Sequence, residues 1–363
     1  MAPQQRANSP KKIASDLSVV AIGGGTGLST LLKGLKRYVL TPALAASGKV
    51  AIRELSGVVT VSDDGGSSGR LRKEFNMLPP GDVRNCIVAL SEDEALLSKL
   101  FQHRFQKGSG LEGHSFGNLF LAALTSITGD FAEAVRLSSE ILLTRGHIYP
   151  ATTSNVELEA LMEDGTRVRG ETRITASKGK IRELFLVPPD VDPLPQTVEA
   201  IGDADLITIG PGSLFTSLIP NLLVRGMANE IVKSRAIKVY VCNLMTQANE
   251  SLSLTAADHI RALTTHAGAQ LFDYALINRT AASSEMKAKY ALEGASQIVA
   301  DLEAIEALGV CPVLGDYLDE GAVARHATDR LAHDLMALMA QAPQRKPLPQ
   351  IDQKPPAGSN NLS

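Results

Sequence analysis

Short apolar runs rich in β-branched residues alternate with longer segments of amphipathic helical spacing along most of the chain. This alternation is typical of a parallel sheet whose strands are joined by helices. Buried strands are predicted at Val19–Ile22, Val58–Val61, Leu206–Ile209, Lys238–Val241 and Tyr274–Ile277. Helices are predicted at Leu28–Val39, Phe116–Thr128, Phe131–Thr144 and Asn221–Ser234. The pattern therefore predicts an α/β fold with a doubly wound, mostly parallel sheet.

One stretch breaks this rhythm and has the alternation of antiparallel strands. Turn residues separate three strand-like segments there, Asn155–Met162, Arg167–Thr175 and Ile181–Val187. We expect a small antiparallel β-meander, inserted into the main fold at about residues 151–190, that serves as a lid or a dimer arm. Its edge strands would need covering, which makes a homo-oligomer a reasonable hypothesis.

The two ends of the chain differ in composition from the rest. Residues 1–16 are polar, and residues 341–363 are rich in Pro and Gln. Such segments bury too little apolar surface to fold, so we expect a disordered tail at each end. Residues 17–340 show no internal repeat and are expected to form a single α/β domain. The first residues lack the apolar core of a secretory signal, and no apolar run reaches the roughly 18 residues of a membrane span. We therefore expect a cytoplasmic protein.

Charge and aromatic content exclude several classes of partner. Lys plus Arg is 36 and Asp plus Glu is 39, which leaves a formal net charge of −3. A nucleic-acid binder carries a strongly basic surface instead. The chain has no Trp, 6 Tyr and 9 Phe, too few for stacking platforms under single-stranded bases. Its three cysteines, Cys86, Cys242 and Cys311, are far apart in sequence and indicate neither a disulfide framework nor a zinc ribbon.

A glycine-rich loop follows the first predicted strand and precedes the first predicted helix. Glycines there let backbone N–H groups approach a phosphate, and the helix N-terminus adds unsatisfied donors and partial positive charge. The spacing departs from the dinucleotide fingerprint because Leu28 stands where the third glycine belongs, which counts against a nicotinamide-cofactor oxidoreductase. The alternative is a tight turn that binds nothing. The phosphate-binding candidates in this loop are Gly23, Gly24, Gly25, Thr26 and Gly27.

A second glycine loop, with Gly210, Gly212 and Ser213, follows the strand at Leu206–Ile209. Asn243 follows the next strand. Carboxyl ends of parallel strands share one edge of a sheet, and ligands bind in the crevice there. We therefore expect the two glycine loops to face each other across a binding site, unless they are unrelated turns.

An acidic and polar stretch follows the second predicted strand. An acid in this place commonly meets a ribose hydroxyl, and adjacent carboxylates also suit Mg²⁺. The serines and the arginine add donors for a phosphate. The alternative is a flexible, solvated loop that binds no ligand. The candidates are Asp63, Asp64, Ser67, Ser68 and Arg70.

Two further segments place polar groups just before apolar helices. Asp82 is expected to cap a helix whose first turn displays Arg84 and Asn85. His114 and Asn118 flank another helix start, where His114 is a candidate acid–base or phosphate contact, or else a capping residue. No nucleophile elbow, zinc motif or Ser-His-Asp arrangement accompanies them. The residues indicate ligand binding more clearly than catalysis, and no catalytic residue is assigned.

Six motifs in order resemble the bacterial gluconeogenesis factor family, of the YvcK/CofD-like kind. They are IGGGTGLSTLLKGLK, VTVSDDGGSSGRLR, PPGDVRNCIVALS, GHSFGNLFLAAL, GPGSLFTSLIPNLL and VYVCNLMTQ. The resemblance covers about Val19 to Leu338 and implies a Rossmann-like, nucleotide-binding core. The DDGGSSGR and NLMTQ sequences resemble the YvcK branch more than the CofD branch.

The YvcK branch implies a cytoplasmic regulator that binds UDP-sugars such as UDP-N-acetylglucosamine. Such regulators are needed for cell shape during gluconeogenic growth, and a cell-wall synthesis protein is the expected partner. The resemblance places two late residues in the UDP-sugar site, Tyr290 and Arg325. Relatives usually read Arg-His-Asp where this chain has Ala327, and Asp329 stands nearby as a substitute carboxylate.

The CofD branch implies the alternative, a Mg²⁺-dependent 2-phospho-L-lactate transferase that uses a nucleotide diphosphate donor. The position that touches the deazaflavin in those transferases matches Asp82 here. The catalytic candidates for that activity are Asp63, Asp64 and Asp82.

Overall fold

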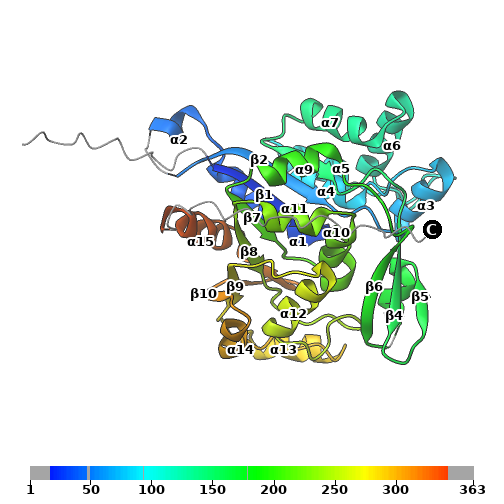
Figure 1. Ribbon diagram of the computed structural model, residues 1–363. Coiled ribbons are helices and arrows are strands. Elements are labelled where there is room, and N and C mark those ends of the chain that lie inside the picture. Colours follow the sequence, from blue (N-terminus) through cyan, green and yellow to red (C-terminus); the bar gives the residue numbers. More distant parts are fainter. Residues whose placement is uncertain (1–16, 47–49, 93, 178, 342–363) are drawn as a thin grey trace, which may run out of the picture.

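A seven-stranded sheet, parallel throughout, forms the centre of the computed structural model, which describes residues 17–46, 50–92, 94–177 and 179–341 (Figure 1). The strand order is β10-β9-β8-β7-β1-β2-β3. The strands are β1 (Leu17–Gly23), β2 (Ile52–Val59), β3 (His147–Pro150), β7 (Leu206–Ile209), β8 (Ile237–Val241), β9 (Tyr274–Asn278) and β10 (Cys311–Gly315). The predicted fold class, a parallel α/β sheet with a small antiparallel addition, is confirmed.

The direction of winding reverses beside β1. From β1 the chain builds outward through β2 to β3, then returns to β7 and builds the other way through β8 and β9 to β10. Connections that leave β1 and β7 on opposite faces open a crevice at the carboxyl ends of these two strands. Both glycine loops lie there, one after each strand.

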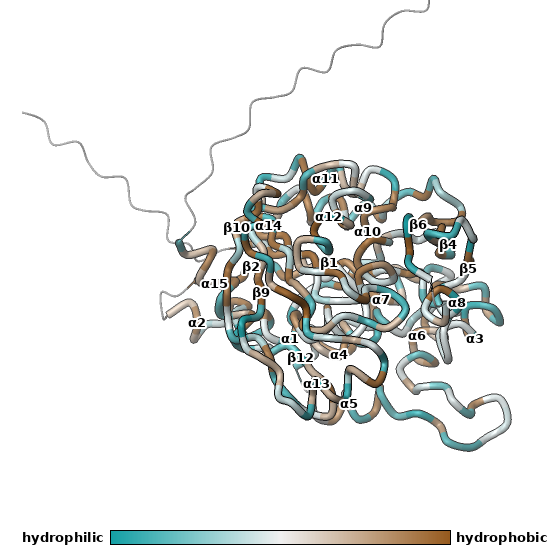
Figure 2. The backbone as a smooth tube through the Cα atoms, turned by 90° about the horizontal axis from the view of Figure 1, so that it is seen from below, coloured by the Kyte–Doolittle hydropathy of each residue, from teal (hydrophilic) through white to brown (hydrophobic). Residues whose placement is uncertain are grey.

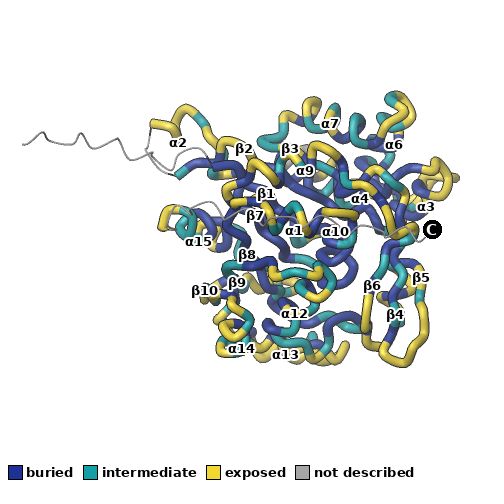
Figure 3. The backbone as a smooth tube through the Cα atoms, in the orientation of Figure 1, coloured by how far each residue is buried: buried dark blue, intermediate teal, exposed yellow. Residues whose placement is uncertain are grey.

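Helices cover both faces of this sheet (Figure 2). One face carries α1 (Gly25–Leu35), α4 (Gly81–Leu90) and α15 (Thr328–Gln341). The other carries α9 (Pro195–Gly202), α10 (Ile219–Leu223), α11 (Met227–Lys233) and α12 (Ala256–Ala267). Because helices cover both faces, every residue of β1, β7 and β8 is buried (Figure 3).

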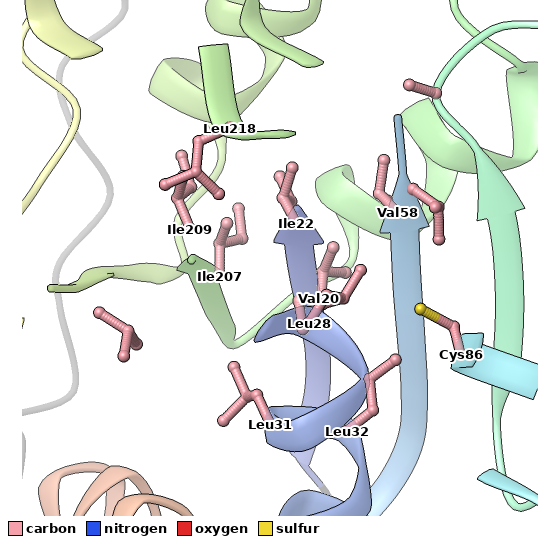
Figure 4. Close-up of a cluster of buried hydrophobic side chains, with 14 of the residues drawn as sticks. Val20, Ile22, Leu28, Leu31, Leu32, Val58, Cys86, Ile207, Ile209 and Leu218 are labelled. Carbon is pink, nitrogen blue, oxygen red and sulfur yellow. The ribbon is translucent and has the colours of Figure 1, made fainter. Parts of the chain in front are cut away.

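The core lies between the central strands and these helices. Figure 4 shows Val20, Ile22, Val58, Ile207 and Ile209 of the strands together with Leu28, Leu31 and Leu32 of α1. Each fully buried side chain of this size contributes about 1.5–3 kcal/mol by leaving water. The core therefore holds rigid the strand ends from which the glycine loops start.

The remaining elements surround this frame or extend it. They are η1 (Lys36–Tyr38), α2 (Pro42–Ala46), α3 (Gly66–Phe75), α5 (Glu94–Gln102), α6 (Phe116–Thr128), α7 (Phe131–Ile141), η2 (Leu214–Leu218), α13 (Ser284–Ala291), α14 (Leu302–Ala307), β11 (Leu318–Glu320) and β12 (Ala324–His326). β11 and β12 form an antiparallel hairpin. In the part of the chain that the structure describes, no helix combines the length and apolar character needed to cross a membrane.

The insertion is a three-stranded antiparallel sheet in the order β5-β4-β6, with β4 (Glu157–Met162), β5 (Arg167–Arg169) and β6 (Ile181–Val187). The predicted middle strand Arg167–Thr175 is wrong in its second half, because Glu171–Ala176 forms helix α8. Gly170, with φ +96°, ends the strand. The insertion therefore carries a helix that the sequence pattern did not reveal.

Other differences from the predicted elements are local. The helix predicted at Asn221–Ser234 is broken at Val224–Gly226, where Gly226 has φ +77° and starts α11. The helix predicted to Thr144 ends at Ile141, and the helix predicted at Leu28–Val39 already begins at Gly25. The edge strands β3 and β10 were not predicted. The expected disordered tails, apart from Gln341, lie outside the described residues.

Candidate functional site

A cavity of about 570 Å³ opens at the carboxyl ends of β1 and β7. Its floor is formed by the two glycine loops, and one wall by residues 243–248 after β8. The opposite wall comes from α13 and the β11–β12 hairpin, through Tyr290 and Arg325. The expected crevice between the two loops is therefore present.

Close backbone contact holds the two loops together. A methyl group at Gly27 would lie 2.3 Å from the Pro211 carbonyl oxygen and 2.9 Å from the Gly212 nitrogen. At Gly24 it would lie 2.7 Å from Thr60 Cγ2 and 2.9 Å from Asp82 Oδ2. Real Cβ atoms do not come so close, so Gly27 is needed for the two loops to meet, and Gly24 lets the first loop lie against Thr60 and Asp82.

The first loop presents free donors to the cavity. Helix α1 begins at Gly25, whose φ is +61° and whose N–H donates to the Asp82 carboxylate. Among the described residues, no acceptor pairs with the N–H groups of Thr26 and Gly27. Unpaired donors in the first turn of a helix bind anions, and the partial positive charge of the helix end adds to the attraction.

The second loop is already satisfied by protein groups. Oε1 of the buried Glu250 accepts hydrogen bonds from the backbone N–H groups of Phe215 (2.8 Å) and Thr216 (2.9 Å). The side chain of Asn243 bonds to both the N–H (3.1 Å) and the carbonyl (2.7 Å) of Gly212. A protein carboxylate thus occupies the anion position of this loop. The first loop is the better place for a phosphate.

The outer wall adds an aromatic ring and a cation. Tyr290 Oη accepts a hydrogen bond from the Ala324 N–H at 3.2 Å, which ties α13 to the hairpin. Arg325 is exposed and, within the described residues, has no ion-pair partner. Burial lowers the pKa of His326 to about 4, so the neutral ring donates from Nε2 to the Cys242 carbonyl oxygen at 3.0 Å.

Asp329 does not place a carboxylate beside Arg325 in the cavity. Its side chain forms an ion pair with Arg37 at 2.5 Å and does not line the cavity. The suggested substitution for Ala327 is therefore wrong.

Carboxyl groups gather at the inner side of the first loop. Asp82 touches this loop, and its pKa rises to about 6 because it is buried and because Asp63 is near. Glu171 reaches in from α8 of the insertion, and burial together with Asp63 and Asp82 raises its pKa to about 9. We call Asp63, Asp64, Asp82 and Glu171 the acidic cluster.

Two members of the acidic cluster hold backbone in place. Asp64 Oδ1 accepts from the Thr172 N–H at 2.9 Å and from Thr172 Oγ1 at 2.6 Å, which caps α8. Asp63 Oδ1 accepts from the Gly65 N–H at 2.8 Å. No group of three or more His, Cys, Asp or Glu side chains in the described ranges is arranged to hold a metal ion. The Mg²⁺ site that the sequence suggested, held through one carboxylate and waters, stays a prediction.

A separate polar network lies beyond the acidic cluster. The buried Ser67 hydroxyl bonds to His114 Nδ1 (2.9 Å) and accepts from Asn118 Nδ2 (3.1 Å). Arg84 donates to Ser115 Oγ at 2.5 Å and to Asn85 Oδ1 at 2.8 Å. Among the described residues, Arg84 Nε and Asn118 Oδ1 of this network are buried without a hydrogen-bond partner, and none of its side chains lines the cavity.

The structure corrects two helix-cap predictions in this region and places Arg70 outside the cavity. Asp82 does not cap α4, because the helix begins at Gly81 and its N-terminus has no side-chain cap. Ser115, rather than His114, caps α6. Arg70 is exposed and donates to the Glu112 carbonyl oxygen at 2.8 Å, outside the cavity.

The predicted site residues therefore divide into two groups. Nine line the cavity, namely Gly24, Gly25, Thr26, Gly27, Gly212, Ser213, Asn243, Tyr290 and Arg325. The others lie behind or beside it, namely Gly23, Asp63, Asp64, Ser67, Ser68, Arg70, Asp82, Arg84, Asn85, His114, Asn118 and Gly210.

Sequence reasoning missed several residues at the site. Thr246 and Gln247 line the cavity and belong to the NLMTQ segment, so their motif was visible although only Asn243 was singled out. Gln247 Nε2 donates to Ser213 Oγ at 2.9 Å, which links this segment to the second loop. Glu171 and Glu250 carried no sequence signal because tertiary contacts alone bring them here.

Comparison with known proteins agrees with this architecture. The family model described as "2-phospho-L-lactate transferase CofD" matches residues 19–318. A gluconeogenesis factor from Halalkalibacterium halodurans is 48% identical over 321 residues, which cover 88% of this chain and 95% of that protein. The gluconeogenesis factor of Bacillus subtilis is 46% identical over 325 residues, 89% of this chain and 98% of that one.

A solved structure supports the same relationship. The crystal structure of a UPF0052-family protein from Bacillus halodurans superposes with a TM-score of 0.83 and 47% sequence identity. The match covers 89% of this chain and 99% of the other. Together these matches show that the chain belongs to the CofD family, within which its similar relatives are named gluconeogenesis factors.

Proposed function

We propose that this protein is a gluconeogenesis factor that binds a nucleotide sugar of the UDP-N-acetylglucosamine type and acts as a cytoplasmic regulator of cell shape. The observation that carries the proposal is the cavity, in which the free N–H groups of Thr26 and Gly27 face the same space as Arg325 and Tyr290. Donors at a helix end, a guanidinium and an aromatic ring are the groups that a nucleoside diphosphate needs.

Each part of such a ligand has a counterpart in the cavity. The diphosphate would accept hydrogen bonds from the α1 amides, and Arg325 would neutralise its charge. The ring of Tyr290 would pack against the nucleoside. Gln247 lines the cavity, and its Oε1, which has no partner among the described residues, offers an acceptor for sugar hydroxyls.

The hydrogen bonds that the acidic cluster makes to backbone groups favour a regulator over a transferase. Asp64 caps α8, Asp63 holds Gly65 and Asp82 accepts from Gly25. Carboxylates committed to backbone groups are poorly placed for metal-assisted chemistry. The ligand-bound protein would act by binding a partner protein of cell-wall synthesis.

The second candidate is a 2-phospho-L-lactate transferase-like activity, which the matching family model favours. Asp82 is the group best placed for it, because it touches the first loop and its pKa of about 6 suits proton transfer near neutral pH. A transferase would convert its nucleotide donor, whereas a regulator would return the ligand unchanged.

Calorimetric titration of the full chain with UDP-N-acetylglucosamine, UDP-glucose, GDP and NAD tests the proposal, with and without Mg²⁺. We expect UDP-sugar binding and recovery of intact ligand. Arg325→Gln should weaken binding at least tenfold, because a charge-assisted contact contributes about 1.5–3 kcal/mol. Arg235→Gln, an exposed arginine just before β8, is the matched control.

Two further variants distinguish a regulator from a transferase and from a protein whose first loop binds no ligand. Gly25→Val would place a branched side chain at φ +61° beside the phosphate position and should abolish binding while the fold persists. Asp82→Asn should raise the affinity of a regulator for its anionic ligand by removing a nearby negative charge. A transferase would instead lose turnover. Normal binding by Gly25→Val would mean that the first loop is only a turn.

A further inference from the structure

The segment of residues 243–251, which follows β8, holds the second glycine loop in place. Three of its side chains bond to successive points of that loop, namely Asn243, Gln247 and Glu250. Asn243 and Gln247 also line the cavity, whereas Glu250 is not part of its lining. Glu250 therefore supports the loop without facing the ligand.

Glu250 meets the backbone where the loop has no acceptor of its own. The N–H groups of Phe215 and Thr216 lie in the first turn of η2, which leaves them without a partner inside that helix. Oε1 of Glu250 accepts both hydrogen bonds, at 2.8 and 2.9 Å. Phe215 and Thr216 are both buried, so these two N–H groups would be left unsatisfied without the carboxyl group.

The position of Oε1, rather than its charge, is what the loop requires. Glu250 is only 8% exposed, and burial raises its pKa, although the hydrogen bonds from Thr216 and Phe215 act in the opposite direction. A carboxyl oxygen accepts hydrogen bonds whether the group is ionised or protonated. A neutral side chain of the same length should therefore serve as well.

Hydrogen bonds within the segment tie Glu250 to a residue of the cavity wall. The N–H groups of Glu250 and Ser251 both donate to the Gln247 carbonyl oxygen, and the Gln247 N–H donates to Ser251 Oγ at 3.0 Å. Gln247 lines the cavity, and its Oε1 is buried without a partner among the described residues. On the far side, Asn249 Nδ2 donates to the Thr175 carbonyl oxygen of α8 at 3.1 Å. Glu250 and Gln247 therefore belong to one braced turn.

We infer that Glu250 is a positioning residue for the ligand, which sets the second glycine loop against the first and Gln247 in the cavity wall. The second loop touches the first at Pro211, whose carbonyl oxygen would lie 2.3 Å from a methyl group at Gly27. Displacement of the second loop would therefore also disturb the phosphate position at the start of α1. The inference rests on the proposed function, because the ligand is the nucleotide sugar proposed above.

Replacement of the missing carboxylate by acetate tests this inference in the full chain. Glu250→Ala removes one methylene group and the carboxylate, which are close in size and shape to acetate. The variant should bind UDP-N-acetylglucosamine at least tenfold more weakly, because two buried N–H groups lose their acceptor. Added acetate should restore the affinity to within about threefold of the wild type, whereas sodium chloride at the same ionic strength should not. The amides of Phe215 and Thr216 should exchange faster in the variant and slow again with acetate.

Two other substitutions keep the test decisive if Glu250→Ala does not fold. Glu250→Gln keeps an acceptor oxygen at the same reach and should bind within about threefold of the wild type. Glu250→Asp keeps the charge on a side chain one methylene shorter, and should bind about tenfold more weakly. Asp301→Ala is the matched control, because Asp301 Oδ1 accepts the Ala257 N–H at 2.9 Å at the start of α12, outside the cavity. It should bind the ligand as the wild type does.

Three results would overturn the inference. They are unchanged affinity in Glu250→Ala, an equal loss of affinity in Asp301→Ala, and acetate that restores the two amides without restoring the binding. Failure of the wild type to bind UDP-N-acetylglucosamine would instead contradict the proposed function. Amide exchange at Phe215 and Thr216 would still decide, without any nucleotide, whether Glu250 positions the loop.

Discussion

Glu171 is the member of the acidic cluster whose ionisation is most strongly opposed. Burial and the nearby Asp63, Asp82 and Asp64 raise its pKa to about 9, against an ordinary value of 4.5. Between these two pH values the folded chain holds a proton that the unfolded chain has released. Stability therefore falls as the pH rises through this window, because the folded state binds more protons there.

Glu171→Gln removes this dependence and should stabilise the fold at high pH. At pH 5 the variant and the wild type should unfold at about the same urea concentration. At pH 8.5 the variant should be more stable by about 1–3 kcal/mol, a value reduced for the partial exposure of the side chain. Glu163→Gln, an exposed acid in the β4–β5 turn, should show no such difference. A variant less stable than the wild type at pH 8.5 would contradict the raised pKa.

Single residues were predictable where the backbone demands them. The first loop was recognisable because Gly24, Gly25 and Gly27 stand directly after an apolar strand. Close contacts favour glycine at Gly24 and Gly27, and a φ of +61° favours it at Gly25. Glu250 was not recognisable, because its role depends on a fold that brings it to the N–H groups of Phe215 and Thr216. Tertiary partners of this kind leave no local pattern.

Helix α8 shows the same limit at the scale of an element. The sequence Arg-Val-Arg followed by β-branched residues favours a strand, yet the chain turns at Gly170 and forms a helix. Asp64, more than a hundred residues earlier, caps that helix through Thr172. On the other side of the insertion, Nε2 of the half-buried His266, whose pKa is lowered by burial, accepts a hydrogen bond from the Leu184 N–H at 3.1 Å. A third hydrogen bond runs from Asn249 Nδ2 to the Thr175 carbonyl oxygen of α8. The insertion is thus held from several sides, and one of these contacts is in the acidic cluster.

Thr172→Val should loosen α8 without unfolding the protein. The change removes the hydroxyl that donates to Asp64 at 2.6 Å but keeps the shape of the side chain. A hydrogen bond of this kind contributes about 1 kcal/mol. Amide exchange in residues 171–176 should therefore be roughly fivefold faster, with global stability nearly unchanged.

The matched control for this change is Thr175→Val. Its hydroxyl bonds only to carbonyl groups within α8, those of Glu171 and Thr172. Thr172→Ser keeps the hydroxyl and should exchange as the wild type does. Equal acceleration in Thr172→Val and Thr175→Val would mean that the bond to Asp64 does not hold the helix.

At the scale of the whole molecule, the candidate site lies where the two halves of the sheet meet. The strands β1, β2 and β3 form one half, and β7 to β10 form the other. The first loop belongs to one half and the second loop to the other, and Gly27 touches Pro211 across the joint. This part of the fold was predictable because each half repeats a strand–loop–helix pattern. The opposite wall, with Tyr290 and Arg325, was placed by resemblance alone.

Alanine substitutions at two glycines of α1 distinguish a loss of contact between the glycine loops from a general loss of stability. A methyl group at Gly27 would lie 2.3 Å from the Pro211 carbonyl oxygen, whereas one at Gly34 would lie 2.6 Å from the Thr328 carbonyl oxygen, where α15 packs. Both alanine variants crowd backbone atoms and should lose about 1–3 kcal/mol of stability in urea unfolding. Only Gly27→Ala pushes the two glycine loops apart, so only it should weaken UDP-N-acetylglucosamine binding, by tenfold or more. Equal binding losses in the two variants would show that the contact between the loops does not shape the site.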